Sequence, residues 1–575
     1  MVRLRAARAG EARELSALVM RSKAHWGYDR AYLAACAPAL LIGESELAAR
    51  RIVVAEDDRG PLGVSSLEGS PRGPEPAAEL GLLFVAPGAM GRGVGRRLYR
   101  DALARAGELG FARLHIAADP HARAFYRAMG ARPVPARDGL PCFEAVPAPE
   151  PGWVRAWTGG GRAVHLGNVA EFNAQFGRTR PEPAGRTEDH YACLAAFYSP
   201  HPAALVLPLS VPRPWLALVA RRLEWDEVEL YDGLAEEGAP LTAALRGRPA
   251  LAARLRGLGL PVIPWGRAGA DAGLRYESKS AANALFRRLV GTGGHPGIRV
   301  PEQTRVPGRR TAARLLTDRA RAGSTTVLKT EHGVGGSGTT VVTPGRLRAL
   351  GGPRSVVRAL PRGPLLVEEF VPADGAYGDL TYDGFVDGAG RVHEVGSAVM
   401  EVAGTAYQGA TVGPGAVPTA LAAAAGDFGR AVGDVLAAEG YRGWYDVDFV
   451  ADPEGRLAPT ETNLRLTGPS VAFMVKARLD RLRGAGHLVR IVDRVPLGAR
   501  LAEAELVAFL DRLGAACAAL DALLIPAVPT AARAPAPYLG VLLAAYTWAA
   551  LEAADALVRR EAAALRAMFG EPELL

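Results

Sequence analysis

A lysine followed by a run of glycines is the first place where this sequence could bind phosphate. Residues 327–342 read VLKTEHGVGGSGTTVV, with Lys329 at the end of an apolar run and with Gly335, Gly336 and Ser337 in the loop that follows. In the familiar nucleotide loop the lysine follows the last glycine and opens a helix, whereas here it comes first and the chain returns to β-branched residues. The order predicts a phosphate-binding loop between two strands.

Acidic residues far along the chain could hold the metal ion that phosphoryl chemistry needs. Asp448 lies in an apolar run, a turn-forming segment follows, and Glu461 and Asn463 end the next run. Residues two apart on a strand face the same side, and a hairpin would bring Asp448 across from that pair. Three oxygen ligands on one face form a good site for a hard cation such as Mg²⁺.

Lysine is rare in this chain, and two of its positions coincide with motifs that could do chemistry. Of the 68 basic residues only four are lysines: Lys23, Lys279, Lys329 and Lys476. Where arginine fills nearly every cationic role, a remaining lysine can serve chemistry that needs a compact ammonium group. Chance survival of these lysines is the alternative.

A second glycine motif lies near the N-terminus. The stretch ELGLLFVAPGAMGRGVGRRLY is a strand pattern, then Gly91, Gly93 and Gly95, then an amphipathic helix pattern. Glycines before a helix let backbone N–H groups approach an anion at the positive end of the helix dipole. This arrangement suits a pyrophosphate, and an ordinary glycine-rich turn is the alternative.

With the following segment LHIAADPHARAFYRAMGAR, this motif resembles the GNAT family of acetyl-CoA-dependent N-acetyltransferases over residues 1–146. The family's pyrophosphate loop falls on the stretch MGRGVG, where Arg92, Gly93 and Gly95 fit the pattern. Met90 departs from the usual Gln or Arg at its position. The resemblance implies an α/β fold that binds acetyl-CoA at this loop.

The same resemblance implies roles in acetyl transfer. Tyr126 would protonate the departing thiolate, and Glu79 at the start of a strand would act as the general base, directly or through water. A solvated strand-end carboxylate is the alternative for Glu79. His25 and Trp26 fall where such folds line the acceptor pocket, with core packing as the alternative.

The motifs in the second half of the chain strongly resemble the ATP-grasp superfamily. In that family an acid and a Glu-x-Asn pair bind two Mg²⁺ ions, which places the metal on Asp448, Glu461 and Asn463. A lysine before a glycine-rich flap contacts the phosphates of ATP, which corresponds to Lys329 and its loop. An earlier lysine at the start of a helix also contacts ATP, and Lys279 in YESKSAANALFRRL matches it.

The ATP-grasp resemblance extends to the adenine and ribose contacts. The strand pattern LLVEEFV matches the segment that holds adenine, with Glu368 and with Glu369 and Val371 as backbone partners. The acid that binds ribose is assigned to Asp379 in preference to Asp374.

The expected fold class is α/β multidomain, because strand and helix patterns alternate through most of the chain. We expect a GNAT α/β domain over residues 1–146, a pre-ATP-grasp α/β domain over 153–275, an ATP-grasp α+β core over 276–495 and a helical C-terminal region over 496–575. The segments GNVAEFNAQFGRT and TETNLRLTGPS look like the class that includes the pheganomycin-type peptide ligases.

Composition excludes several other classes of protein. At 575 residues the chain exceeds a single core. No apolar run spans a bilayer and no signal-peptide pattern occurs, which predicts a cytoplasmic protein. Four widely spaced cysteines argue against zinc and disulfides. The net charge of +8 is interleaved with acids, which argues against nucleic-acid binding.

These resemblances imply a bifunctional enzyme that uses ATP, Mg²⁺ and acetyl-CoA. An amino acid or small amine would be N-acetylated, and a carboxylate would be activated as an acyl phosphate and ligated to an amine, with release of ADP. Arg465 would face the transferred phosphoryl group or the carboxylate. The expected partners are small amino acid or peptide substrates, and neither nucleic acid nor a membrane is expected. A homodimer is possible.

Three other functions compete with this hypothesis. The first is a peptide ligase with a catalytically silent or regulatory GNAT domain, which the departure at Met90 favours. The second is a nucleotide-binding module without catalysis. The third is an ADP-forming acyl-CoA synthetase, which the lack of a CoA-binding Rossmann glycine signature disfavours.

Overall fold

The computed structural model describes residues 2–176, 184–235, 240–269, 273–333, 336, 338–360, 362–373 and 375–569. The chain forms two compact units. Unit 1 comprises Met1–Pro151 and Ala477–Gly486, and unit 2 comprises Gly152–Lys476 and His487–Leu575. Both units mix helices and strands, in agreement with the predicted α/β class.

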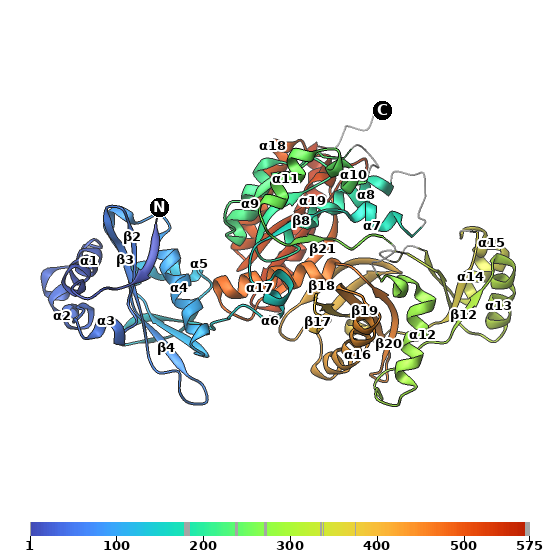
Figure 1. Cartoon of the computed structure of the whole chain (residues 1–575), viewed down its shortest axis with the longest axis horizontal. Helices are drawn as coiled ribbons and strands as arrows, with labels where there is room; N and C mark the ends of the chain where they lie inside the picture. Colours follow the sequence, from blue (N-terminus) through green and yellow to red (C-terminus); the bar gives the residue numbers. More distant parts are fainter. Residues whose placement is uncertain are drawn as a thin grey trace. The chain divides into compact units, whose positions relative to one another are not determined.

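Unit 1 is built around one sheet. Its strands are β1 (Arg3–Ala6), β2 (Val53–Asp57), β3 (Gly60–Glu68), β4 (Ala77–Val85), β5 (Arg113–Ala117), β6 (Arg132–Arg137) and β7 (Leu140–Ala145), and its helices are α1 (Ala12–Ala24), α2 (Arg30–Leu40), α3 (Glu46–Ala49), α4 (Val94–Glu108) and α5 (Arg123–Ala128). The strand order is β1-β2-β3-β4-β5-β7-β6. Neighbouring residues of β2 face opposite sides, so Val54 packs with Leu15 of α1 while Val53 packs with Leu98 of α4. Figure 1 shows α1 and α4 on opposite sides of the sheet.

The parallel strands β4 and β5 stay together over only a short length. They pair from Ala77 with Arg113 to Glu79 with His115. Beyond that point β4 continues to Val85 without further pairing to β5. The two strands therefore separate after Glu79, toward the end of β4 that leads into α4.

The first part of unit 2 is a small parallel sheet with helices. Its strands are β8 (Ala163–Leu166), β9 (Pro202–Val206), β10 (Glu229–Tyr231) and β11 (Val262–Pro264), and its helices are α6 (Gly152–Thr158), α7 (Val169–Ala174), α8 (Ala184–Tyr191), α9 (Arg213–Leu223), α10 (Leu241–Arg246) and α11 (Pro249–Gly257). The order is β10-β9-β8-β11, with parallel pairing throughout. Every residue of β9 is buried, as expected for a parallel strand covered on both faces.

A four-stranded antiparallel sheet follows. Its strands are β12 (Gln303–Val306), β13 (Thr326–Thr330), β14 (Thr339–Val342) and β15 (Leu365–Glu369), and its helices are α13 (Arg309–Arg321), α14 (Pro344–Ala349) and α15 (Pro353–Arg358). The order is β12-β15-β13-β14. Leu328 and Val367 pack against Leu316 of α13. Their strand neighbours Lys329 and Glu368 consequently face the opposite side.

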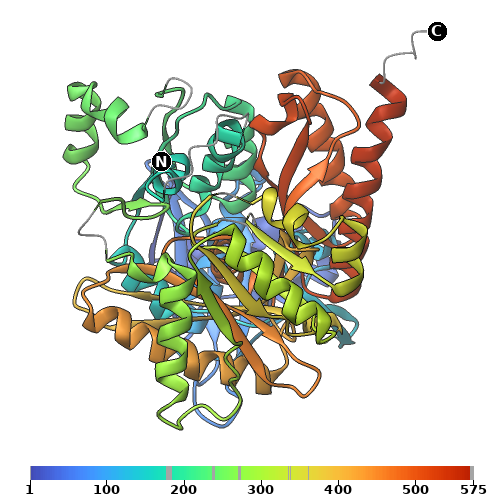
Figure 2. The same ribbon diagram turned by 90° about the vertical axis from the view of Figure 1, so that its right-hand side faces the viewer.

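The largest sheet has eight strands. They are β16 (Asp379–Val386), β17 (Val392–Ala403), β18 (Ala406–Val412), β19 (Gly443–Ala451), β20 (Leu457–Asn463), β21 (Leu488–Pro496), β22 (Ala522–Val528) and β23 (Tyr538–Ala545). The order is β20-β19-β16-β17-β18-β21-β23-β22. The helices α12 (Lys279–Val290) and α16 (Thr419–Ala438) share one core with this sheet and lie side by side in Figure 2. The remaining helices are α17 (Gly468–Arg483), α18 (Glu503–Ala518) and α19 (Trp548–Phe569).

The predicted helical C-terminal region contains two strands as well as helices. α18 and α19 are present, but β22 and β23 lie between them and extend the eight-stranded sheet from β21. Leu524 and Leu543 of these strands pack with Leu510 and Leu551 of the two helices. Short runs of Ala, Leu and Val suit helix and strand alike, and here pairing with β21 decides the outcome.

Candidate active site

A cavity of about 810 Å³ lies in unit 2 and is lined from both the four-stranded antiparallel sheet and the eight-stranded sheet. It collects most of the residues predicted for the ATP site: Lys329, Gly336, Glu368, Glu369, Val371, Asp379, Asp448, Glu461, Asn463 and Arg465. Gly335, Ser337 and Asp374 lie outside the described residues. Residues that are far apart in the sequence therefore share one cavity.

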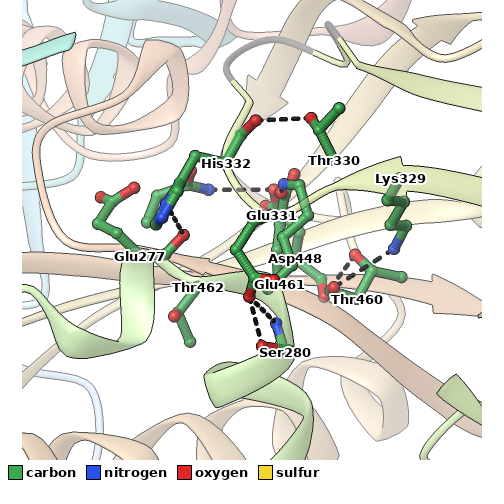
Figure 3. A network of polar contacts seen from close by, with 12 residues as sticks. Glu277, Ser280, Lys329, Thr330, Glu331, His332, Asp448, Thr460, Glu461 and Thr462 are labelled. Atoms are coloured by element: carbon green, nitrogen blue, oxygen red, sulfur yellow. Dashed lines mark hydrogen bonds and ion pairs between the residues drawn. The ribbon is translucent and has the colours of Figure 1, made fainter. Parts of the chain in front are cut away.

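Lys329 bridges the two sheets. Its ammonium group lies 2.6 Å from a carboxylate oxygen of Glu368 on β15. The same group donates to the carbonyl oxygen of Thr460 on β20 at 3.4 Å (Figure 3). Both side chains of the Lys329–Glu368 pair are almost fully buried. The pair holds the Lys329 ammonium group in a fixed position in the wall of the cavity.

The glycine-rich stretch connects β13 to β14, which confirms the predicted return to a strand. Gly336 has a φ of +80°, and a Cβ there would lie 1.5 Å from the carbonyl oxygen of Thr405 between β17 and β18. Only glycine allows this conformation and this approach. The amide of Thr330 donates to the carbonyl oxygen of Gly338 at 2.9 Å.

Glu331, the residue after β13, connects the glycine-rich loop to α12. The amide of Lys279 donates to the carbonyl oxygen of Glu331 at 3.0 Å. The Glu331 carboxylate accepts from the Ser278 hydroxyl at 2.6 Å. It also accepts from the Ser280 hydroxyl, as Figure 3 shows. The base of the glycine loop and the start of the Lys279 helix are thus one hydrogen-bonded unit.

The predicted metal ligands lie on paired strands. Asp448 is directly opposite Glu461, and Asp446 is directly opposite Asn463. The Asn463 amide group donates to Asp446 at 2.7 Å and to Asp448 at 3.2 Å. Sequence reasoning missed Asp446, although it lies two residues before Asp448 and so faces the same side of β19.

A third aspartate lies beside these two. Asp383 of β16 is directly opposite Asp446, and one of its oxygens accepts from the Trp444 indole at 2.8 Å. Burial raises the pKa of Asp448 to about 6, although the charges of Lys279 and Arg465 oppose this effect. Burial also raises the pKa of Asp383 to about 8 and that of Asp446 well above its usual range, and the negative charge of Asp448 adds to both shifts. The nearby cations therefore offset only part of the cost of burying the ionised cluster.

Two ion pairs hold the ligands and the arginine in place. Lys279 is buried and pairs with Glu461. Arg465 pairs with Glu277 at 2.8 Å and 3.0 Å, and Glu277 also accepts from the backbone amide of Leu464. Arg465 lines the cavity, but its guanidinium group is already paired with the Glu277 carboxylate. Glu277 was not identified from the sequence, although this residue lies two positions before Lys279.

The donor set fits Mg²⁺ when substrate phosphates supply the remaining ligands. Asp448 and Glu461 offer carboxylates, and Asn463 offers an amide group. Among the described residues no three His, Cys, Asp or Glu side chains form a complete metal cage. Mg²⁺ is typically held by one or two carboxylates together with phosphates and water, and so needs no complete protein cage.

The predicted adenine and ribose residues border the same cavity. Glu368 accepts from the Gln303 side chain at 2.6 Å. The Glu369 side chain pairs with Arg299, and its amide donates to the carbonyl oxygen of Glu302 at 2.8 Å. The backbone amide of Glu369 is therefore already engaged in a hydrogen bond within the protein. Burial raises the pKa of the Asp379 carboxyl.

In unit 1 the glycine motif forms the start of α4. Gly91 and Gly93 have φ of +75° and +81°, and open space surrounds the position of a Cβ at each. Gly93 precedes the first helical residue, and no described side chain caps the helix there. The exposed N–H groups suit a pyrophosphate such as that of acetyl-CoA. Gly95 lies in the first turn, and Arg92 is more than half exposed, 4.0 Å from Asp57.

The predicted acetyl-transfer residues differ in their surroundings. Tyr126 is buried against the rings of Tyr99, Phe125 and Phe143, and burial raises its pKa. Its hydroxyl is therefore protonated at neutral pH, as a general acid requires. Glu79 is exposed, 4.0 Å from Arg137, at the point where β4 and β5 separate.

His25 and Trp26 lie at the surface of unit 1. Both side chains are exposed, so the alternative of core packing is wrong. Trp26 stacks on the ring of His121 at 4.9 Å and contacts His25 at 5.5 Å. Their predicted role in an acceptor pocket remains a prediction.

Residues 19–131 match the family model described as "Acetyltransferase (GNAT) family". Over these residues the N-terminal part of the chain is similar to GNAT acetyltransferases. A search of curated proteins found no match to the chain.

Solved structures resemble both parts of the chain. Carboxyaminoimidazole ribonucleotide synthase from Aspergillus clavatus, complexed with ATP, is 11% identical with a TM-score of 0.40, over 70% of this chain and 97% of that chain. N5-carboxyaminoimidazole ribonucleotide synthetase from Thermus thermophilus is 18% identical with a TM-score of 0.40, over 69% and 98%. The PaiA N-acetyltransferase from Thermoplasma acidophilum, in complex with coenzyme A, is 14% identical with a TM-score of 0.23, over 25% and 98%. Similarities with these TM-scores do not assign a function, so the proposed function rests on the geometry of the site.

Within the described part of the chain, every helix is too short or too polar to cross a bilayer.

Proposed function

We propose that unit 2 is an ATP-dependent, ADP-forming carboxylate–amine ligase and that unit 1 is an acetyl-CoA-dependent N-acetyltransferase. The observation that carries the ligase proposal is the convergence of the Lys329–Glu368 pair with the opposed Asp448 and Glu461 in one cavity. A fixed cation on one sheet and carboxylates on the other suit a triphosphate with its metal ion.

The proposed reaction has two steps. A carboxylate oxygen of the substrate attacks the γ-phosphorus of ATP, and the bond from that phosphorus to the bridging oxygen breaks to give an acyl phosphate and ADP. An amine nitrogen then attacks the acyl carbon. The carbon–oxygen bond to phosphate breaks, and the amide, inorganic phosphate and one proton are released.

The residues of the cavity have distinct roles in this scheme. Lys329 neutralises phosphate charge, and the Gly336 loop excludes water from the acyl phosphate. Arg465, oriented by Glu277, faces the carboxylate. Mg²⁺ held by Asp448 and its neighbours would neutralise the charge that develops on the transferred phosphoryl group.

In this proposal the two reactions take place one after the other. Unit 1 acetylates the amine of an amino acid, and unit 2 ligates the carboxylate of the product to a second amine. The four domains at residues 1–146, 153–275, 276–495 and 496–575, the cytoplasmic location and the choice between monomer and homodimer stay predictions.

The order of the two steps is tested with free amino acids as the only acids. We expect ADP formation to require acetyl-CoA, because only the acetylated acid is ligated. Equal ADP formation without acetyl-CoA would contradict the sequence of steps while leaving the ligase itself intact.

A ligase with a silent GNAT domain is the second candidate, and Met90 favours it. Release of CoA from acetyl-CoA with the twenty standard amino acids as acceptors distinguishes the two. An active domain releases CoA, and Tyr126→Phe lowers that rate by about 10²-fold or more if Tyr126 is the general acid. A silent domain releases none.

A further inference from the structure

The wall of the cavity holds a group of buried polar atoms that the proposed ATP contacts leave unused. Each atom is a side-chain nitrogen or oxygen that has no hydrogen-bond partner among the described residues. The residues are Asn173, Trp265, Tyr407, Arg465, Thr467 and Asp493. Buried polar atoms in folded proteins are normally paired, so this concentration indicates a ligand that supplies the missing partners.

These residues form one continuous part of the wall. Tyr191 at the end of α8 hydrogen-bonds to the carboxylate of Asp493 on β21. The Tyr191 ring packs against the Trp265 ring at 5.6 Å. The carbonyl oxygen of Trp265 accepts from the amide of Leu466 at 2.8 Å. The acid on the large sheet is thereby connected to the segment that carries Arg465.

Tyr407 closes the other side of this compartment. Its hydroxyl lies against Gly468, the first residue of α17, where a Cβ would fall 2.2 Å away. Thr467 immediately precedes this residue, and its hydroxyl oxygen lacks a partner among the described residues. Tyr407 and Asp493 lie on the paired strands β18 and β21, where Gly409 is directly opposite Val492, and both line the cavity. The compartment therefore lies between Asp493 and the start of α17.

The chemistry of the compartment suits a molecule with one positive and one negative end. Asp493 offers an unpartnered carboxylate oxygen, and Tyr191 and Tyr407 line the same cavity. A carboxylate among aromatic rings attracts an ammonium group, through charge and through the faces of the rings. The unpartnered nitrogens of Trp265 and Arg465 are donors, which suit a carboxylate.

We propose that this compartment binds the amine substrate of the ligase as a free amino acid, and that Asp493 selects it by holding its ammonium group and accepts the proton that the nitrogen loses before it attacks. The inference rests on the proposed ligase function. Arg465 joins the two parts of the cavity, because it lies two residues after the metal-site residue Asn463 and two before Thr467. The amine is therefore held next to the place where the acyl phosphate forms.

The experiment compares two nucleophiles in the full chain. Each reaction contains MgATP, an equimolar mixture of the N-acetylated standard amino acids, and either hydroxylamine or a mixture of the twenty free amino acids. Hydroxylamine is a small neutral nucleophile that needs no ammonium site. Acyl hydroxamates and amides are quantified by mass spectrometry.

The variants are Asp493→Asn and Tyr407→Phe, with Asp427→Asn as the matched control. Asp427 lies on the exposed face of α16 and pairs with Arg430, outside the cavity. We expect Asp493→Asn to lower amide yield at least tenfold more than hydroxamate yield, Tyr407→Phe to change the ratio in the same direction, and Asp427→Asn to leave it unchanged. An equal fall of both products in the Asp493 and Tyr407 variants would overturn the inference.

A binding measurement without ATP separates this inference from the ligase proposal. We expect at least one standard amino acid to raise the unfolding temperature of the wild-type chain and of Asp427→Asn, but not that of Asp493→Asn. If no amino acid stabilises the wild-type chain, or if Asp493→Asn is stabilised equally, the compartment is not an amino-acid site. Selective binding without any hydroxamate from the wild-type chain would instead refute the ligase function alone.

Discussion

At the scale of the residue, the candidate ATP site is defined by buried charges that the protein itself only partly balances. Lys329 pairs with Glu368, and Lys279 pairs with Glu461. Burial lowers the pKa of Lys279 to about 7, with the nearby Lys329 charge acting in the same direction. A site in which both cations and carboxylates are held in low-dielectric surroundings favours a ligand that carries both phosphates and a metal ion.

The choice of lysine at position 329 can be tested by Lys329→Arg. The cavity wall holds a compact ammonium group between Glu368 and Thr460, and a planar guanidinium group cannot take the same place. We expect ADP formation to fall by about 10²-fold or more, as for other fixed groups that stabilise charge in a transition state. The rate of ADP formation with MgATP, acids and amines measures this.

The matched control is Arg348→Lys on α14, an exposed residue outside the cavity. It exchanges the same two residue types in the opposite direction, and its rate should stay at the wild-type level. Retention of most activity by Lys329→Arg would mean that positive charge alone suffices at this position.

At the scale of the element, glycines decide how α16 packs on the eight-stranded sheet. A Cβ at Gly429 would lie 2.1 Å from the ring of Tyr382 on β16. A Cβ at Gly426, one turn earlier, would lie 3.3 Å from a side-chain oxygen of Glu394. The first contact is with a buried ring, whereas the second is with the end of a flexible side chain.

Gly429→Ala should therefore destabilise unit 2, by about 1–3 kcal/mol for an overpacked core position. Gly426→Ala is the control on the same helix, and it should be neutral or stabilising by up to about 1 kcal/mol because alanine favours helix over glycine. Urea unfolding of the two variants measures the difference. Equal stability of the two variants would contradict the described packing of α16.

The small parallel sheet contains a buried histidine whose charge state makes stability depend on pH. His165 of β8 contacts the carbonyl oxygen of Ala195 at 2.6 Å and the hydroxyl of Ser199 at 2.8 Å. Burial lowers its pKa from 6.5 to about 3, although the hydrogen bond to Ala195 opposes this effect. The unfolded chain therefore binds a proton between these two values while the folded chain does not.

The stability that neutral His165 contributes is complete above pH 6.5 and is lost as the pH falls toward 3. From pH 7.5 to pH 5 the loss should reach about 2 kcal/mol, at about 1.4 kcal/mol for each unit of pH below 6.5. His165→Gln removes the titrating group, so its stability should fall less over this range. Hydrogen exchange of the β8 and β9 amides measures the stability of both proteins over this pH range. Parallel losses in the two proteins would show that His165 does not titrate as described.

The sequence predicts the local elements well, because their signals are local. The residues of β4 and α4 follow strand and helix periods, and the glycines between them mark the turn. The register of Asp448 with Glu461 follows from a turn and the two-residue period of strands. Asp383 and Asp493 could not be found in this way, because strand pairing between distant segments brings Asp383 beside Asp446 and Asp493 to the cavity.

At the scale of the whole molecule, the chain has two compact units, and each carries its own candidate site. The boundary at residues 151 and 152 lies in the proline-rich stretch that ends the predicted GNAT domain. Within unit 2, the candidate ATP site needs the antiparallel sheet for Lys329 and the eight-stranded sheet for Asp448. Neither sheet would form the site alone.

The central claim is that this cavity transfers the γ-phosphoryl group of ATP to a carboxylate. The most direct test uses N-acetylated amino acids labelled with ¹⁸O in the carboxyl group, together with MgATP and the free amino acids. We predict ADP and inorganic phosphate that carries one ¹⁸O atom from the acid, because the acyl–oxygen bond breaks when the amine attacks. Formation of AMP and pyrophosphate, or of phosphate without the label, would contradict the account.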